Sequence, residues 1–258
     1  MRYALVKNES CEAKNGLAGI CPDCFQPVIA KCGTRRVHHW AHCSGKECSN
    51  FKEPKTEWHY KWQDEFPKEC QEQMVCDKQT GERFRADVLS QHGIVIEFQH
   101  SHIDPQERIA REKFYKKMFW VVDGTRLKRD YPRFMQACEN RIFKTKQQGF
   151  YYISYSDECF PRDWTESEVP VVFDFKGLVT AESQEPFRET LWCLLPKRKG
   201  MRDLLIGMSR ADFVANHHNY LSQINEPVNT ATSKATYASS QTPRFITRPT
   251  YSRRHRHL

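Results

Sequence analysis

Two short segments near the middle of the chain carry acidic and amide side chains that could hold a metal ion. Alternating apolar and polar residues predict strands over 83–88 and 94–99, joined by a tight turn. Asp87 lies near the end of the first strand, and Glu97 and Gln99 share one face of the second. Two converging carboxylates repel each other unless a cation or a proton lies between them. A hard divalent cation with oxygen ligands suits such a pair, so the hairpin predicts a metal site.

A second group of metal-ligating residues lies near the N-terminus. Cys21 and Cys24 form a CxxC pair, and His39 and His42 follow as an HxxH pair. Two such pairs can hold a tetrahedral Zn²⁺ ion, and a redox CxxC is disfavoured because no βαβ pattern surrounds it. The alternative is that these are small buried cysteines and surface histidines. Three neighbours could replace the histidine pair as ligands: His38, Cys43 and Cys48.

The element before the acidic hairpin is predicted to be a helix that starts after Thr56, a good N-cap residue. Apolar residues recur every fourth position along it as a buried stripe: Trp58, Trp62 and Phe66. Glu57 and Lys61 share another face, and the simplest interpretation is a surface ion pair. Because a helix just before an acidic hairpin often lends a carboxylate to its metal site, Glu57 is a third candidate acid.

A second helix is predicted to follow the hairpin. Asp104 is a suitable N-cap, Pro105 fits the first helical position, and Glu107 completes a capping box. The polar face of this helix is strongly basic. The continuous apolar run at 119–124 then predicts a parallel strand buried on both faces. The order helix, hairpin, helix, strand predicts an α/β fold with a mixed sheet flanked by helices.

These residues and their order resemble the PD-(D/E)xK nuclease core, with Glu57 on a helix, Asp87 on one strand and Glu97-Phe98-Gln99 on its neighbour. The wider pattern is similar to the competence protein CoiA-like family of nucleases. It includes the CxxC pair, the His-Trp-Ala-His run at 39–42, the EFQHS segment at 97–101 and the arginine-rich helix that follows. The resemblance covers residues 1–125 and implies a restriction-endonuclease-like fold with a small N-terminal Cys/His zinc module.

The resemblance also implies roles for individual residues. Asp87 and Glu97 would ligate Mg²⁺ or Mn²⁺, with the Phe98 carbonyl as a further ligand and Glu57 in support. Gln99 stands where the named motif has lysine, and an amide can orient a water or a phosphate oxygen but supplies no positive charge. Two other lysines are candidates for that charge: Lys61 and Lys113.

A second formal match to the same motif lies later in the chain. Asp163 precedes Asp174-Phe175-Lys176, and here the lysine is present after a strand-like run at 169–173. No acidic helix and no alternating hairpin precede it, so the first site is preferred.

The rest of the chain gives a coarser pattern. We expect a helix at 131–143, strands at 150–155, 171–175 and 191–195, and an amphipathic helix from Met201 to about His217. The predicted organisation is a zinc-ribbon-like module at 1–50, a nuclease core at 51–125, an extension at 126–224 that completes the core or forms a second lobe, and a disordered basic tail at 225–258.

Composition limits the classes of function. The formal charge of +8 and the pI of about 8.9 suit a polyanionic partner. Mean hydropathy is −0.76 and no run approaches eighteen apolar residues, so no membrane span is expected. The N-terminal segment turns polar too soon for a signal peptide, and eleven cysteines are an odd number, which favours reduced thiols in a cytoplasmic protein.

Three functions follow as hypotheses. The first is a Mg²⁺- or Mn²⁺-dependent deoxyribonuclease with a structural Zn²⁺, acting in DNA processing, recombination, competence or phage defence. The second is a non-catalytic nucleic-acid-binding protein on the same fold, which Gln99 makes plausible. The third is an adaptor whose zinc module and tail bind a protein partner such as a helicase or ATPase.

Overall fold

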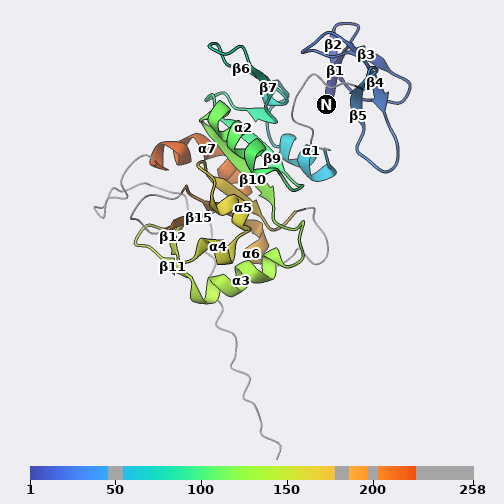
Figure 1. Ribbon diagram of the computed structural model, residues 1–258. Helices are drawn as coiled ribbons and strands as arrows, with labels where there is room; N and C mark the ends of the chain where they lie inside the picture. Colours follow the sequence, from blue (N-terminus) through green and yellow to red (C-terminus); the bar gives the residue numbers. More distant parts are fainter. Residues whose placement is uncertain (46–54, 178–185, 197–202, 225–258) are drawn as a thin grey trace, which may run out of the picture.

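The chain forms a small β module at its N-terminus and a larger mixed α/β unit (Figure 1). The computed structural model describes residues 1–45, 55–177, 186–196 and 203–224. Two expectations, the disordered basic tail at 225–258 and the alternative zinc ligand Cys48, lie outside the described residues.

The N-terminal module is an antiparallel sheet in the order β2-β1-β3-β4-β5. Its strands are β1 (Tyr3–Val6), β2 (Glu9–Glu12), β3 (Ala18–Ile20), β4 (Pro27–Lys31) and β5 (His39–His42). A small core fills it, made of Ala4, Ala13, Cys21, Val28 and Trp40. Gly19 is required there, because a Cβ atom at this position would lie 2.8 Å from the Leu5 carbonyl oxygen.

The larger unit is built on one mixed sheet in the order β11-β12-β15-β14-β13-β10-β9-β8. The strands are β8 (Val88–Leu89), β9 (Val95–Gln99), β10 (Met118–Asp123), β11 (Ile142–Lys144), β12 (Phe150–Ile153), β13 (Val171–Asp174), β14 (Thr190–Leu194) and β15 (Asp203–Ser209). β10 pairs in parallel with β9 and β13, and the other neighbouring pairs are antiparallel. β8 therefore forms an edge of this sheet, beside β9.

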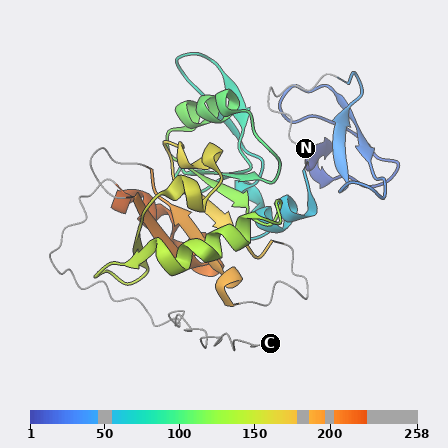
Figure 2. The same ribbon diagram turned by 60° about the horizontal axis from the view of Figure 1, so that its bottom comes forward.

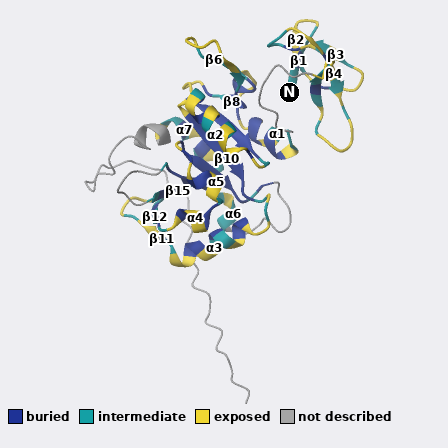
Figure 3. Ribbon diagram, in the orientation of Figure 1, coloured by how far each residue is buried: buried dark blue, intermediate teal, exposed yellow. Residues whose placement is uncertain are grey.

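Helices cover both faces of this sheet (Figure 2). α1 (Glu57–Gln63) and α7 (Arg210–Ile224) pack on one face. The other face is covered by α2 (Pro105–Tyr115), α3 (Asp130–Asn140), α4 (Ser156–Cys159), α5 (Arg162–Thr165) and α6 (Pro186–Glu189). A 3₁₀ turn at Lys68–Cys70 leads to the two-stranded ribbon of β6 (Met74–Cys76) and β7 (Arg83–Arg85). Buried residues concentrate in the sheet and along α1 (Figure 3).

The local signals for the helices next to the acidic hairpin are confirmed. Thr56 caps α1 and accepts a hydrogen bond from the His59 backbone N–H. The predicted stripe of Trp58, Trp62 and Phe66 is buried in the core beneath α1. Asp104 caps α2 through two backbone N–H groups, with Pro105 in the first position. The run from Phe119 to Asp123 is the parallel strand β10, buried along its whole length.

Two segments of the C-terminal half are predicted wrongly. The helix expected at 131–143 ends at Asn140, and Ile142 and Phe143 belong to β11. Residues 203–209 were expected to begin an amphipathic helix, but they form β15, and the helix starts only at Arg210. β15 lies between β12 and β14 and bonds to both. Its pairing partners lie 50 to 56 residues away on β12 and 11 to 19 residues away on β14, so local periodicity does not reveal the strand. Strands β11 to β15 extend the same sheet that carries β8 to β10.

The β module is joined to the α/β unit by a buried polar network. Glu72 accepts hydrogen bonds from the Arg2 backbone N–H at 2.9 and 3.0 Å, and its carboxylate also pairs with Arg85 at 3.1 Å. Arg85 reaches back to the module and forms an ion pair with Asp23, which lies between the two cysteines of the CxxC pair. None of the helices among the described residues is long and apolar enough to span a membrane.

Candidate metal centres

Asp87 lies where the chain bends between β7 and β8, at the edge of the main sheet. The sequence predicted one continuous strand here, but β7 pairs with β6 in a separate ribbon and only β8 pairs with β9, so Asp87 lies between two strands. The Asp87 backbone N–H donates to the Glu97 carboxylate, with 3.3 Å between N and Oε1. The side chain is almost fully buried, and its Oδ2 accepts a hydrogen bond of 2.9 Å from the Phe98 backbone N–H.

Glu97 faces Asp87 from the middle of β9. It is 3% exposed, and its Oε2 accepts a 2.8 Å hydrogen bond from Arg111 Nη1 on α2. Arg111 also pairs with Glu107 one helical turn earlier. The second predicted helix was expected to present a basic outer face, yet Arg111 and Arg108 are buried and turn inward to acidic partners.

The two carboxylates differ in charge state. Burial and the neighbouring Asp87 raise the pKa of Glu97 to about 7, although Arg111 and Lys55 act in the opposite direction. Burial also acts to raise the pKa of Asp87, but Lys55, His59 and the Phe98 amide outweigh it and hold this pKa below its usual value. The pair therefore carries one firm negative charge and one that depends on pH near neutrality.

The donor set fits a hard divalent cation. Asp87 and Glu97 offer buried carboxylate oxygens from neighbouring elements, tied together by the Asp87 N–H, and such oxygens are the ligands that Mg²⁺ and Mn²⁺ prefer. Two cations of the chain itself contact the pair, with the Lys55 ammonium on Asp87 Oδ1 and the Arg111 guanidinium on Glu97. Burying two carboxylates side by side costs too much free energy unless neighbouring cations offset their charge.

The other predicted site residues do not contact the carboxylates of Asp87 and Glu97. Glu57 lies on the exposed surface of α1 and forms an ion pair with Lys61 at 3.0 Å. Both residues therefore form the surface ion pair that was the simplest interpretation of their spacing. Lys113 is exposed on α2. Gln99 is buried, but its amide nitrogen donates to the Ser101 backbone oxygen at 3.1 Å, away from the carboxylates. Its Oε1 has no hydrogen-bond partner among the described residues.

Sequence reasoning missed the residues that hold the pair, and it missed a third group nearby. Lys55 and Arg111 carried no motif signal, because their partners lie 32 and 14 residues away. His100 follows Gln99 directly, and its Nδ1 lies 2.7 Å from Asp123 Oδ2 at the end of β10. The only sequence signal for this last contact is that both residues end parallel neighbouring strands.

The second formal motif match has a different place in the fold. Asp174 is fully buried at the end of β13, and one oxygen accepts the indole N–H groups of Trp58 and Trp62, each at 3.0 Å, and Arg210 at 2.8 Å. Lys176 turns outward to Glu189 at 2.6 Å. This carboxylate connects α1 and α7 to the sheet. Its structural role is therefore enough to explain why an acid lies at this position.

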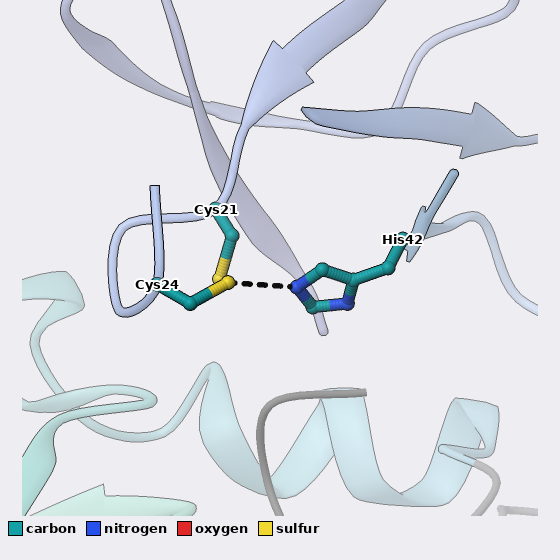
Figure 4. A group of neighbouring side chains, drawn as sticks. All are labelled: Cys21, Cys24 and His42. Atoms are coloured by element: carbon teal, nitrogen blue, oxygen red, sulfur yellow. Dashed lines mark hydrogen bonds between the residues drawn. The ribbon is translucent and has the colours of Figure 1, made fainter. Parts of the chain in front are cut away.

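Cys21, Cys24 and His42 form the second candidate centre (Figure 4). Their ligand atoms all lie within 4.8 Å of one another, and Cys24 Sγ lies 3.2 Å from His42 Nε2. The CxxC turn is closed by backbone hydrogen bonds between Cys21 and both Phe25 and Gln26. Two thiols and an imidazole at this spacing fit a tetrahedral Zn²⁺ ion.

The structure does not bring His39 into this group. His39 and His42 both lie on β5, and residues three apart on a strand point to opposite faces. Trp40 packs into the module core on the same face as His42, while His39 Nδ1 contacts the Val37 carbonyl oxygen at 2.9 Å. The HxxH spacing suits a helix or a loop, so the expected second ligand pair is reduced to His42.

Comparison with known proteins agrees with this division of the chain. The model of the competence protein CoiA N-terminal domain matches residues 6–51, and the model of the CoiA nuclease-like domain matches residues 78–161. Together they cover half of the chain. The chain belongs to the competence protein CoiA family. The first match contains the Cys/His centre of this CoiA-family protein, and the second contains both carboxylates, Asp87 and Glu97. No curated protein and no solved structure matches the chain.

Proposed function

We propose that this CoiA-family protein is a metal-dependent nuclease that hydrolyses DNA phosphodiester bonds. The observation that carries the proposal is the buried, hydrogen-bonded pair of Asp87 and Glu97 within the nuclease-like domain. The family name and the net charge of +8 support a role in DNA processing, such as recombination, competence or phage defence.

Each residue of the pair has a defined task in this proposal. Asp87 and Glu97 hold Mg²⁺ or Mn²⁺, and the Phe98 amide keeps the Asp87 carboxylate oriented. When bound, the divalent ion lowers the pKa of a water and offsets negative charge on the scissile phosphate. Trp58 and His59 on α1 are nearly fully buried, as are Asp87 and Glu97, and this burial limits the access of bulk water to the pair.

The Cys/His module is proposed to have a structural task. A Zn²⁺ ion on Cys21, Cys24 and His42 would stabilise a module whose core has few large side chains. The polar network from Arg2 and Asp23 to Glu72 and Arg85 then fixes this module against the β6–β7 ribbon. We propose no catalytic step for the zinc ion.

A second candidate function is non-catalytic binding of nucleic acid. The observation that favours it is Gln99, which stands at the motif's lysine position and donates its amide to Ser101 instead of reaching the carboxylates. In that case a partner such as a helicase or ATPase would supply the enzymatic activity of the complex.

A cleavage assay separates these functions. The parent protein would be compared with Asp87→Asn and Glu97→Gln on labelled linear, circular and single-stranded DNA, with Mg²⁺, with Mn²⁺ and with EDTA. Glu139→Gln, an exposed carboxylate on α3, is the matched control. Metal-dependent cleavage that both site variants lose and the control keeps supports the nuclease. Binding without cleavage by the parent supports the second candidate.

A further inference from the structure

We propose that Lys55 is the cationic residue of this site and that its ammonium group binds a non-bridging oxygen of the scissile phosphate. The inference rests on the proposed nuclease function and deepens it. Lys55 directly precedes Thr56, the N-cap of α1, and its Nζ contacts Asp87 Oδ1.

Lys55 lies on the accessible side of the carboxylate pair. Its side chain is 21% exposed, whereas the side chains of Asp87 and Glu97 are 5% and 3% exposed. A group that contacts the buried pair and still reaches solvent is placed where an incoming phosphate must approach. A lysine is suited to this, because its flexible stem lets the ammonium move from one oxygen to another.

The charge balance of the site favours such a group. A divalent cation is neutralised by two ionised carboxylates, and the charge of Arg111 is shared between Glu97 and Glu107. The occupied pair would therefore offer little net attraction for a phosphodiester. The phosphate gains further negative charge as the bond to water forms, and a fixed cation stabilises that charge in a site with little water.

The other polar residues near the pair are not placed for this role. His59 lies near Asp87 but is fully buried. Arg111 is 6% exposed and is held between Glu97 and Glu107. Gln99 has no charge and points to Ser101. Lys61 is on the surface with Glu57. Lys55 also lies between the two segments that the family models match, so no motif of either model would reveal it.

In the proposed step Lys55 supplies charge and keeps its protons. The water oxygen forms a bond to phosphorus, and the phosphorus–oxygen ester bond to the leaving group breaks. The water loses one proton to solvent and the leaving oxygen gains one from solvent, so the hydrolysis balances without a proton from the lysine.

The test uses Lys55→Met, which removes the charge at similar length, and Lys55→Arg, which keeps it. Lys61→Met is the matched control, because it removes a surface lysine six residues further along the chain. For each variant, Mn²⁺ affinity is measured by calorimetry without DNA, and cleavage of labelled DNA is measured under single-turnover conditions at saturating Mn²⁺.

We expect Lys55→Met to bind Mn²⁺ as tightly as the parent or tighter, because a competing cation is removed from Asp87. Its cleavage rate should fall about 100-fold, the usual effect of removing one group that stabilises transition-state charge. Lys55→Arg should stay within about tenfold of the parent.

Two results would overturn the role assigned to Lys55 and leave the proposed nuclease function intact. One is cleavage by Lys55→Met within a factor of about three of the parent, when Asp87→Asn abolishes cleavage. The other is an equal loss of Mn²⁺ affinity and cleavage, which would make Lys55 a structural residue. A parent protein that shows no cleavage dependent on Asp87 would instead overturn the proposed function and this inference with it.

Discussion

At the scale of single residues, the central feature is a carboxylate pair in which only one member is firmly ionised. Asp87 has a lowered pKa because Lys55 and backbone donors outweigh its burial, and Glu97 has a pKa raised to about 7. Below that pH Glu97 is mostly protonated. A metal ion must then displace the proton before it can bind both carboxylates.

The affinity for Mn²⁺ should therefore rise with pH until about 7 and then level off. The slope should approach tenfold per pH unit below this value, because one proton is released per ion bound. Calorimetric titration from pH 5.5 to 8.5 measures it, and the dependence of the heat on the buffer's ionisation enthalpy counts the protons. An affinity that is already constant at pH 5.5 to 7 would show that Glu97 is ionised throughout.

At the scale of elements, strand alternation decides which histidine lies beside the two cysteines of the candidate zinc site. β5 places His42 beside Cys24 and turns His39 to the other face. We expect His39→Ala to retain about one zinc ion per chain and His42→Ala to lose most of it. Elemental analysis after dialysis gives the stoichiometry.

The zinc prediction has a control in the cysteine pair. Cys24→Ser should behave like His42→Ala, since its sulfur belongs to the same group of ligand atoms. Full zinc content in His42→Ala, or loss of zinc in His39→Ala, would contradict the assignment from strand geometry.

Asp174, at the end of β13, is hydrogen-bonded to side chains of both α1 and α7. It accepts two indole N–H groups and Arg210 on one oxygen, so Asp174→Asn would set an amide against these donors. We expect a loss of about 3 kcal/mol in the free energy of unfolding, measured with urea at pH 7.5. Mn²⁺ binding by the folded variant should match the parent, because Asp174 is not one of the proposed ligands.

Lys176→Met is the companion control for Asp174. Its partner Glu189 is exposed, and surface ion pairs contribute about 1 kcal/mol or less. If Asp174→Asn abolished Mn²⁺ binding without unfolding the protein, the second formal motif match would have to be reconsidered as the metal site.

At the scale of the whole molecule, Arg85 links the two candidate metal centres. It lies on β7 two residues before Asp87, and its guanidinium pairs with Asp23 of the CxxC turn and with Glu72. Burial lowers the pKa of Arg85, and the neighbouring Cys21 acts in the opposite direction. The ion pairs with Asp23 and Glu72 offset part of the cost of burying the guanidinium. The CxxC turn thus helps to fix the backbone that carries Asp87.

Loss of this link should weaken the distant site. We expect Asp23→Asn to retain zinc and to bind Mn²⁺ about tenfold more weakly, because Arg85 loses a buried partner and residues 85–87 gain freedom. Removal of zinc by a chelator should have an effect at least as large. Calorimetry with Mn²⁺ checks both. Unchanged Mn²⁺ affinity in both cases would mean that the two centres are independent.

Features encoded within a few residues were predictable from the sequence. The caps at Thr56 and Asp104, the stripe of Trp58 and Trp62, and the buried strand β10 follow from local hydrogen bonds and side-chain periodicity. Asp87 and Glu97 came together as expected because one turn joins their strands. Such contacts need little information from the rest of the chain.

The tertiary structure decided everything that depends on contacts between distant segments. It set Lys55 on Asp87 and Arg85 on Asp23 of the CxxC turn. It also made residues 203–209 a strand, because they pair with both β12 and β14. Local propensities are worth tenths of a kcal/mol per residue, whereas burial of paired charges and sheet closure involve several kcal/mol, so packing determined these choices.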